Sequence, residues 1–201
     1  ALTNDMWNPR YAYIAPTYKQ AKSIIFDYLK LYAGVIPGTK FNEQELSCTF
    51  PNGSKIVLLG SENPDSLRGN YYDGIICDEY AQINPRLFPE VIRPALSDRK
   101  GFCYFVGTPQ GMSNDFYAKY QHGLKDKTWY TKIAKASETG IVDEDELDAA
   151  LELMGKNKYR QEFECDWVAA LEGAIYGDVI EKIEDRKQVG RVPYDPTYQV
   201  S

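Results

Sequence analysis

Residues 74–80 read GIICDEY, an apolar run that ends in two adjacent carboxylates, Asp78 and Glu79. The apolar part has strand character and no polar alternation, which is typical of a central parallel strand buried on both faces. Residues 102–106, FCYFV, have the same character, and a helical segment around Leu87–Leu96 separates the two runs. This alternation predicts an α/β sheet with its ligand site at the carboxyl ends of the strands.

A strand and a capped helix are predicted upstream of this pattern. Tyr11–Ala15 reads as a short strand, and Thr17 with Gln20 three residues later is a capping-box signature. We expect the helix to stop near Gly34. Its apolar face is predicted to contain Tyr18, Ala21, Ile25, Tyr28 and Tyr32.

Three further strands are predicted from β-like runs. Glu45–Phe50 and Lys55–Leu59 flank the turn sequence Pro51-Asn52-Gly53, which indicates a hairpin. Trp129–Ile133 reads as another strand.

The character of the chain changes after residue 140. Residues 143–146, DEDE, place acids where the macrodipole of a first helical turn favours them, so we interpret them as a helix start rather than a metal site. An apolar stripe follows at Leu147, Ala150, Leu151 and Met154. We therefore divide the chain into a core at 1–140, a small helical subdomain at 141–192 and a linker at 193–201.

Composition excludes several classes of protein. The 201 residues suffice for one core, and the net charge of −6 argues against a wholly basic nucleic-acid module. The apolar runs are too short to span a membrane, and no signal segment opens the chain. Because the start, ALTNDMWNP, lacks an initiator Met, we expect a piece of a longer protein.

The carboxylates of Asp78 and Glu79 allow two interpretations. Burying a carboxylate costs several kcal/mol unless a partner or metal compensates it, so the strand either surfaces here or delivers two acids to a metal and a water. In P-loop NTPases this position supplies an Asp to the magnesium shell and a Glu that polarises the attacking water.

Two other motifs lie near this strand in the sequence. Gly107-Thr108-Pro109 ends the next apolar run, so the Thr108 hydroxyl would lie beside the carboxylates if the two strands are neighbours. The alternative is a plain turn by which the strand leaves the sheet. Arg68 lies in a polar loop from which a guanidinium can reach a phosphate, or else only contact local carboxylates such as Asp65.

These segments together resemble the ATPase domain of the large terminase subunit of tailed bacteriophages. The resemblance is carried by GSENPDSLRG, YYDGIICDEYAQI and VIRPALSDRKGFCYFVGTPQG, and it extends to YIAPTYKQAK and YRQEFECDWVAALEGAIYG. It covers the chain from about Tyr11 to about Pro196, and in it GIICDEY is similar to a Walker B segment. The implied fold is a P-loop NTPase-like, mostly parallel sheet flanked by helices, with a small C-terminal helical subdomain.

The implied activity is ATP hydrolysis, with ATP and Mg²⁺ as cofactors, that drives double-stranded viral DNA into procapsids. The resemblance makes Asp78 the magnesium-organising acid and Glu79 the catalytic base. Thr108, within Gly107-Thr108-Pro109, matches the motif that couples hydrolysis to movement. Arg68 matches the position at which some family members place an arginine finger.

The sequence also departs from the family pattern. No GxxxxGK[ST] motif occurs in the 201 residues, so the nucleotide-binding residues stay unassigned. We expect the phosphate-binding loop upstream of Ala1 and the nuclease domain that cuts concatemeric DNA beyond Ser201. We therefore expect this piece alone to be inactive.

Two other functions remain open at this point. One is another P-loop DNA motor, such as a helicase-like ATPase, and the other is a non-catalytic module that binds DNA or the portal. For the terminase, the resemblance implies the viral DNA, the portal protein and the small terminase subunit as partners, and a homo-oligomeric ring on the procapsid. It implies the host bacterial cytoplasm as location, with no membrane association and no place in the mature virion.

Overall fold

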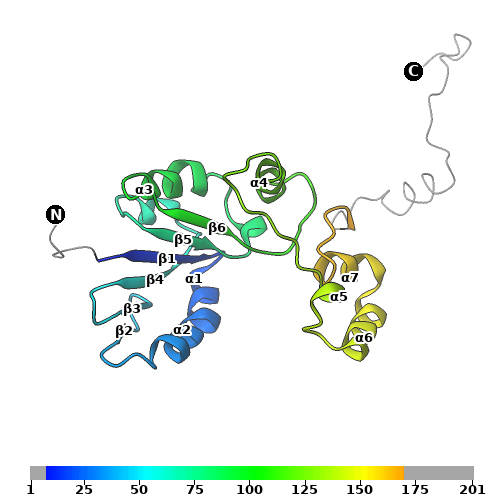
Figure 1. Cartoon of the computed structure of the whole chain (residues 1–201), viewed down its shortest axis with the longest axis horizontal. Coiled ribbons are helices and arrows are strands. Elements are labelled where there is room, and N and C mark those ends of the chain that lie inside the picture. Colours follow the sequence, from blue (N-terminus) through cyan, green and yellow to red (C-terminus); the bar gives the residue numbers. More distant parts are fainter. Residues whose placement is uncertain (1–7, 170–201) are drawn as a thin grey trace, which may run out of the picture.

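The computed structural model describes residues 8–169, which form a six-stranded sheet, flanking helices and a helical unit (Figure 1). The sheet has the order β2-β3-β4-β1-β5-β6. Its strands are β1 (Arg10–Ala15), β2 (Lys40–Asn42), β3 (Ser47–Thr49), β4 (Lys55–Gly60), β5 (Gly74–Cys77) and β6 (Phe102–Phe105). Neighbouring strands from β4 to β6 are parallel, and β2 and β3 are antiparallel. The predicted mostly parallel α/β sheet is confirmed, as is the hairpin between β3 and β4.

Helices and helical turns lie between some of the strands and after the last one. Those before β6 are α1 (Tyr18–Gln20), a π-helical turn (Ala21–Ile25), α2 (Phe26–Ala33), 3-10 turns (Pro64–Leu67 and Tyr80–Gln82), a second π-helical turn (Phe88–Ile92) and α3 (Arg93–Ser97). After β6 come α4 (Asp115–Gly123), α5 (Ala136–Thr139), α6 (Glu144–Met154) and α7 (Lys156–Glu162).

The two faces of the sheet are covered differently (Figure 1). On one face, Ile14, Ile75 and Cys77 pack with residues of the second π turn and α3 in the larger core cluster. On the other face, α1 and α2 cover β4 and β1, where Phe26 and Leu58 belong to a smaller cluster. Within residues 8–169, no helix covers that second face over β5 and β6.

The uncovered area corrects one prediction. Both apolar runs were expected to be buried on both faces, but β6 is an edge strand among the described strands, and its Phe102 and Tyr104 are 49% and 56% exposed. Ile76 of β5, on the same face, is also exposed. The apolar composition of these strands is therefore not explained by the contacts of the described residues.

The predicted apolar face of the first helix is also wrong in part. The capping box of Thr17 and Gln20 forms, and α2 ends at Ala33 before Gly34 as expected. However, the π turn at Ala21–Ile25 rotates the following residues, because a π-helix has more residues per turn than an α-helix. Phe26 and Ala33 are buried, whereas Tyr28 and Tyr32 are exposed and stack on each other with ring centroids 6.4 Å apart.

The strand predicted at Trp129–Ile133 does not form. A strand needs a neighbour for its backbone hydrogen bonds, and this segment instead lies across a cavity of about 600 Å³ from β6. Trp129 contacts the sheet through its ring, which stacks on Phe105 at 5.7 Å between centroids.

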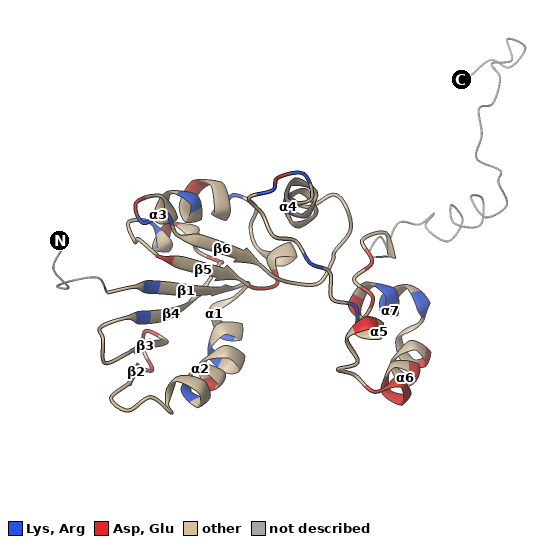
Figure 2. Cartoon of the chain, in the orientation of Figure 1, with Lys and Arg blue, Asp and Glu red and all other residues tan. Residues whose placement is uncertain are grey.

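The helical unit of α5, α6 and α7 lies beyond α4, away from the sheet (Figure 1). Acidic residues occupy the first turn of α6 behind the N-cap residue Asp143, which confirms the predicted helix start (Figure 2). None of the described helices combines the length and apolarity needed to cross a bilayer. The end of the predicted subdomain and the predicted linker at 193–201 lie outside the described residues.

Candidate active site

Asp78 and Glu79 follow β5 at the carboxyl edge of the parallel sheet. Asp78 still belongs to the ladder, because its N–H donates a hydrogen bond of 2.9 Å to the Ile14 carbonyl of β1. Glu79 leaves the strand with φ 47° and ψ 45°, the left-handed conformation that non-glycine residues rarely adopt. A non-glycine residue held in this conformation is typical of a functional position.

Tyr80 anchors the strained turn. Its ring is buried, its N–H donates to the Val106 carbonyl at 2.9 Å, and its hydroxyl donates to Asp115 Oδ2 at 2.6 Å. Asp115 begins α4, so one side chain links the end of β5 to that helix. These contacts hold Glu79 in place without involving its carboxylate.

Asp78 has a partner that the sequence did not indicate. The Tyr13 hydroxyl of β1 donates a hydrogen bond to Asp78 Oδ2. Burial raises the pKa of Tyr13, and the hydrogen bond and negative charge of Asp78 raise this pKa further. Tyr13 and Asp78 are 65 residues apart in sequence, so only the pairing of β1 with β5 brings them together.

Glu79 lies in surroundings that favour its protonated form. Burial raises the pKa of Glu79, as do the negative charges of Asp78 and Glu162. Hydrogen bonds from the Thr108 N–H and from Gln82 act in the opposite direction but leave the pKa above its ordinary value. A carboxylate with a raised pKa is a better proton acceptor than an ordinary one at neutral pH.

The Gly107-Thr108-Pro109 turn lies directly against Glu79. β5 and β6 are parallel neighbours, and the Val106 N–H donates to the Cys77 carbonyl at 2.9 Å. Gly107 has φ 151°, and a Cβ atom there would lie 3.0 Å from Glu79 Cα and 3.0 Å from Tyr80 N. Glycine at 107 therefore permits the close approach of this turn to the Glu79 backbone.

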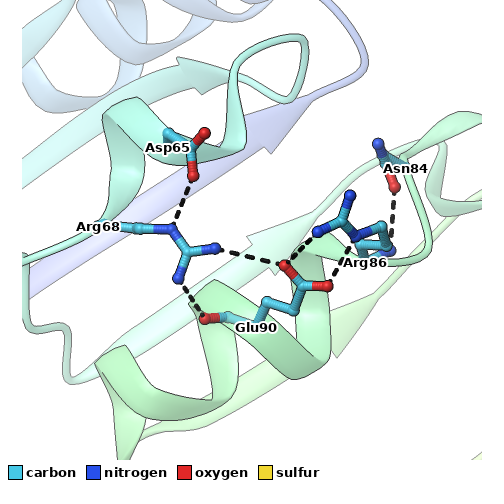
Figure 3. Close-up of polar contacts among 5 residues, drawn as sticks. All are labelled: Asp65, Arg68, Asn84, Arg86 and Glu90. Carbon is cyan, nitrogen blue, oxygen red and sulfur yellow. Dashed lines mark hydrogen bonds and ion pairs between the residues drawn. The ribbon is translucent and has the colours of Figure 1, made fainter.

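Arg68 is held by local acids (Figure 3). Its Nε donates to Asp65 Oδ1 at 2.8 Å, and its Nη1 and Nη2 each lie 3.3 Å from oxygens of Glu90, the backbone carbonyl and the carboxylate respectively. Glu90 also accepts hydrogen bonds from Arg86. Among the described residues, no hydrogen bond or ion pair joins Arg68 to Asp78 or Glu79. In the structure Arg68 thus makes the local contacts that the sequence left as an alternative.

A magnesium ion fits Asp78 only in combination with a nucleotide. Residues 8–169 contain no group of three or more His, Cys, Asp or Glu side chains arranged to hold a metal. Mg²⁺ that accompanies a nucleotide, however, is bound through one or two carboxylates together with phosphates and waters. A single half-buried carboxylate at a strand end meets that requirement.

Comparison with known proteins assigns the chain to a family. The sequence model for "Terminase large subunit, T4likevirus-type, N-terminal" matches residues 6–182. The large terminase subunit of Escherichia phage T5 is 28% identical over 189 residues, which cover 90% of this chain and 42% of that protein. The chain thus spans less than half the length of this relative.

Solved structures show the same fold. The large terminase ATPase domain of Thermus phage P74-26 has a TM-score of 0.59 and 24% identity over 80% of this chain and 77% of that one. The large terminase of a thermophilic bacteriophage, in complex with ADP, has a TM-score of 0.66 and 14% identity over 81% of this chain and 42% of that one. Because the family model matches most of the chain, the chain belongs to the T4likevirus-type large terminase subunits and corresponds to their N-terminal region.

Proposed function

We propose that this chain is the ATPase motor portion of a viral terminase large subunit that packages double-stranded DNA into procapsids. The observation that carries the proposal is the contact between two strand ends. Asp78 and Glu79 after β5 meet the Gly107-Thr108-Pro109 turn after β6, at the edge where parallel α/β sheets bind ligands. The family membership supports a terminase rather than a helicase-like motor.

In this proposal the acids have separate roles. Asp78 organises Mg²⁺, which neutralises phosphate charge when it is bound with the nucleotide. Glu79 acts as the base that orients the attacking water, and its raised pKa suits that role. Thr108 is assigned to sense the γ-phosphate. Since its turn packs against the Glu79 backbone, a displacement of the turn would also displace Glu79. Tyr13 holds the Asp78 carboxylate in one orientation.

ATP is the proposed nucleotide, and the phosphate-binding loop is proposed to come from a part of the protein outside these 201 residues. The ADP complex of a bacteriophage large terminase with the same fold supports nucleotide binding. Among the described residues, nothing pairs with the outer edge of β6 or covers the apolar face of β5 and β6, which offers a place for a further strand and helix. A strand parallel to β6 would end beside Gly107, where such a loop would have to lie.

The other properties of the complete protein are proposed from the family resemblance. They are nuclease cleavage of concatemeric DNA by a further domain, assembly as a ring, and binding to the portal and the small subunit. The proposed location is the host cytoplasm, with transient attachment to the procapsid. Arg68 is proposed to complete a neighbouring subunit's ATP site after it leaves Asp65 and Glu90.

Substitution of the two acids in the full-length protein tests this function. Glu79→Gln should keep ATP binding and lower the hydrolysis rate about 10²–10⁴-fold, because the base is lost. Asp78→Asn should in addition weaken Mg²⁺-dependent nucleotide binding. Calorimetric titration and steady-state ATPase assays measure both effects, with Glu152→Gln on the exposed side of α6 as control. A Glu79→Gln protein that hydrolyses ATP at the wild-type rate would remove Glu79 from the mechanism. A wild-type protein without ATPase activity would favour a non-catalytic module.

A further inference from the structure

One buried side chain connects the helical unit to the candidate active site. Gln161 of α7 is only 8% exposed, and its Nε2 donates a hydrogen bond of 2.9 Å to the Pro109 carbonyl. Lys158 Nζ lies 3.3 Å from Gln161 Oε1, which orients the amide with its N–H groups toward Pro109. A buried polar group is costly without a partner, so this contact stabilises one placement of α7 on the turn.

The contact leads directly to Glu79. Pro109 follows Thr108, whose backbone N–H lies close enough to the Glu79 carboxylate to lower its pKa. Gly107 leaves no space between this turn and the Glu79 backbone, since even a Cβ atom would come within 3.0 Å of Glu79 Cα. A displacement of the turn must therefore move either the Thr108 amide relative to the Glu79 carboxylate or the backbone of Glu79 itself.

The segment that follows α7 makes a second attachment to the same stretch of chain. Trp167 packs on Phe116, Tyr117 and Tyr120 of α4, with ring centroids 5.3, 5.2 and 5.4 Å away. The N-cap residue of α4, Asn114, donates to the carbonyls of Gln110 and Gly111 at 2.8 and 3.0 Å. The two attachments thus join α7 and the segment that follows it to the stretch of chain that begins at the turn after β6.

We propose that Gln161 is a positioning residue that holds the Gly107–Pro109 turn against Glu79 and makes α7 move with that turn during the ATP cycle. The inference rests on the proposed ATPase function and assigns to one amide the coupling between that site and the helical unit. Gln161 touches no reacting atom and acts only through Pro109 and Thr108.

Two variants of the full-length protein separate this role from a packing role. Gln161→Leu removes the donor, and Gln161→Glu keeps the shape but places a carboxylate oxygen against the Pro109 carbonyl. Lys156→Leu, at an exposed position of the same helix, is the matched control. Both Gln161 variants should lower kcat for ATP about tenfold and leave KM within about twofold, since small misplacements of catalytic groups reduce rates without changing binding. The control should match the wild type.

Hydrogen exchange provides a readout that does not depend on turnover. On addition of Mg-ADP, the wild type should change protection both at residues 107–111 and in α7, whereas the Gln161 variants should respond at 107–111 alone. Unchanged kcat in both variants, or an α7 response that persists in them, would overturn the proposal. A wild type that binds Mg-ADP but does not hydrolyse ATP would remove the proposed function, and the exchange result would still decide whether Gln161 links α7 to the turn.

Discussion

At the scale of single residues, the backbone of Glu79 is the most unusual feature of the site. The left-handed conformation at φ 47° brings Glu79 Cβ close to the following carbonyl and costs roughly 1–2 kcal/mol in a non-glycine residue. The main-chain hydrogen bond of Tyr80 and the buried Tyr80 ring hold this conformation in place. The contacts of Tyr80 therefore offset the cost of a strained backbone at the residue that carries the candidate catalytic carboxylate.

Because of this strain, we expect glycine and alanine substitutions at position 79 to show the reverse of the stability order that is usual inside a helix. Glu79→Gly should be more stable than Glu79→Ala by about 1 kcal/mol, because glycine adopts the left-handed conformation without steric cost. Urea unfolding of the 201-residue chain measures the difference. At Glu152, inside α6, the same pair should show the usual order, with alanine more stable by about 1 kcal/mol. The usual order at both positions would show that the backbone of Glu79 is not strained.

The raised pKa of Glu79 predicts a pH-dependent stability change. Between its unfolded and folded pKa values the native state binds more protons than the unfolded state, so Glu79 lowers stability as pH rises through that interval. Glu79→Gln should therefore raise the melting temperature at neutral pH. The gain should disappear at about pH 4, below the ordinary pKa of a glutamate. A gain of equal size at both pH values would argue against a raised pKa.

At the scale of elements, α4 begins at a residue that serves two purposes. Asn114 Oδ1 accepts a hydrogen bond from the Tyr117 N–H at 3.0 Å and caps the helix, while its Nδ2 fixes the Gln110 and Gly111 carbonyls. The start of the helix and the end of the turn after β6 thus depend on one side chain.

Two substitutions of Asn114 should separate its contribution as the cap of α4 from its hydrogen bonds to the turn. Asn114→Ala should cost about 1–2 kcal/mol of stability, the usual range for loss of a cap together with local hydrogen bonds. Asn114→Asp should cost less, because its carboxylate still caps α4 but cannot donate to the turn. Denaturant unfolding of both variants tests this, and equal stability of Asn114→Ala and wild type would show that the cap contributes nothing.

The elements also show which predictions could be made from local sequence. The capping box at Thr17, the hairpin turn and the acidic start of α6 were predictable because each depends on residues a few positions apart. The buried face of the first helix was not, because one π turn changes the rotation of everything after it. The strand at Trp129–Ile133 failed because strand formation depends on a neighbour, which no local pattern reports.

At the scale of the whole molecule, the arrangement of Arg68 and Glu90 bears on assembly. Arg68 is half-exposed, and Glu90 would keep Arg86 as a partner if Arg68 moved away (Figure 3). Exposed ion pairs of this kind are weak and screened by salt. The loop can therefore release the guanidinium without leaving an unpaired buried charge.

A mixing experiment tests whether Arg68 acts on a neighbouring subunit. Full-length Arg68→Ala and Glu79→Gln subunits, each inactive alone, should regain part of the ATPase activity when they form mixed rings. The reason is that some interfaces then combine an intact Arg68 with an intact Glu79, and an arginine finger contributes about 10³–10⁵ in rate. No recovery in rings shown to be mixed would reject action in trans. An Arg68→Ala protein with undiminished ATPase would reject any catalytic role.

The sequence by itself determined where the chemistry can reside. An apolar run that stops at Asp78 and Glu79, and another that stops at Gly107-Thr108-Pro109, place polar groups at the carboxyl ends of strands, since strand character and turn chemistry are local properties. Parallel pairing of the two strands then brings these ends to one edge of the sheet.

Only the tertiary structure decided which groups touch. Tyr13 reaches Asp78, the turn after β6 packs against the Glu79 backbone, and Gln161 holds Pro109 from 52 residues away. The exposed side of β6 likewise became visible only when the helices were placed on the sheet. Each of these contacts depends on how separate elements pack, and packing is a sum of many distant interactions that no short stretch of sequence contains.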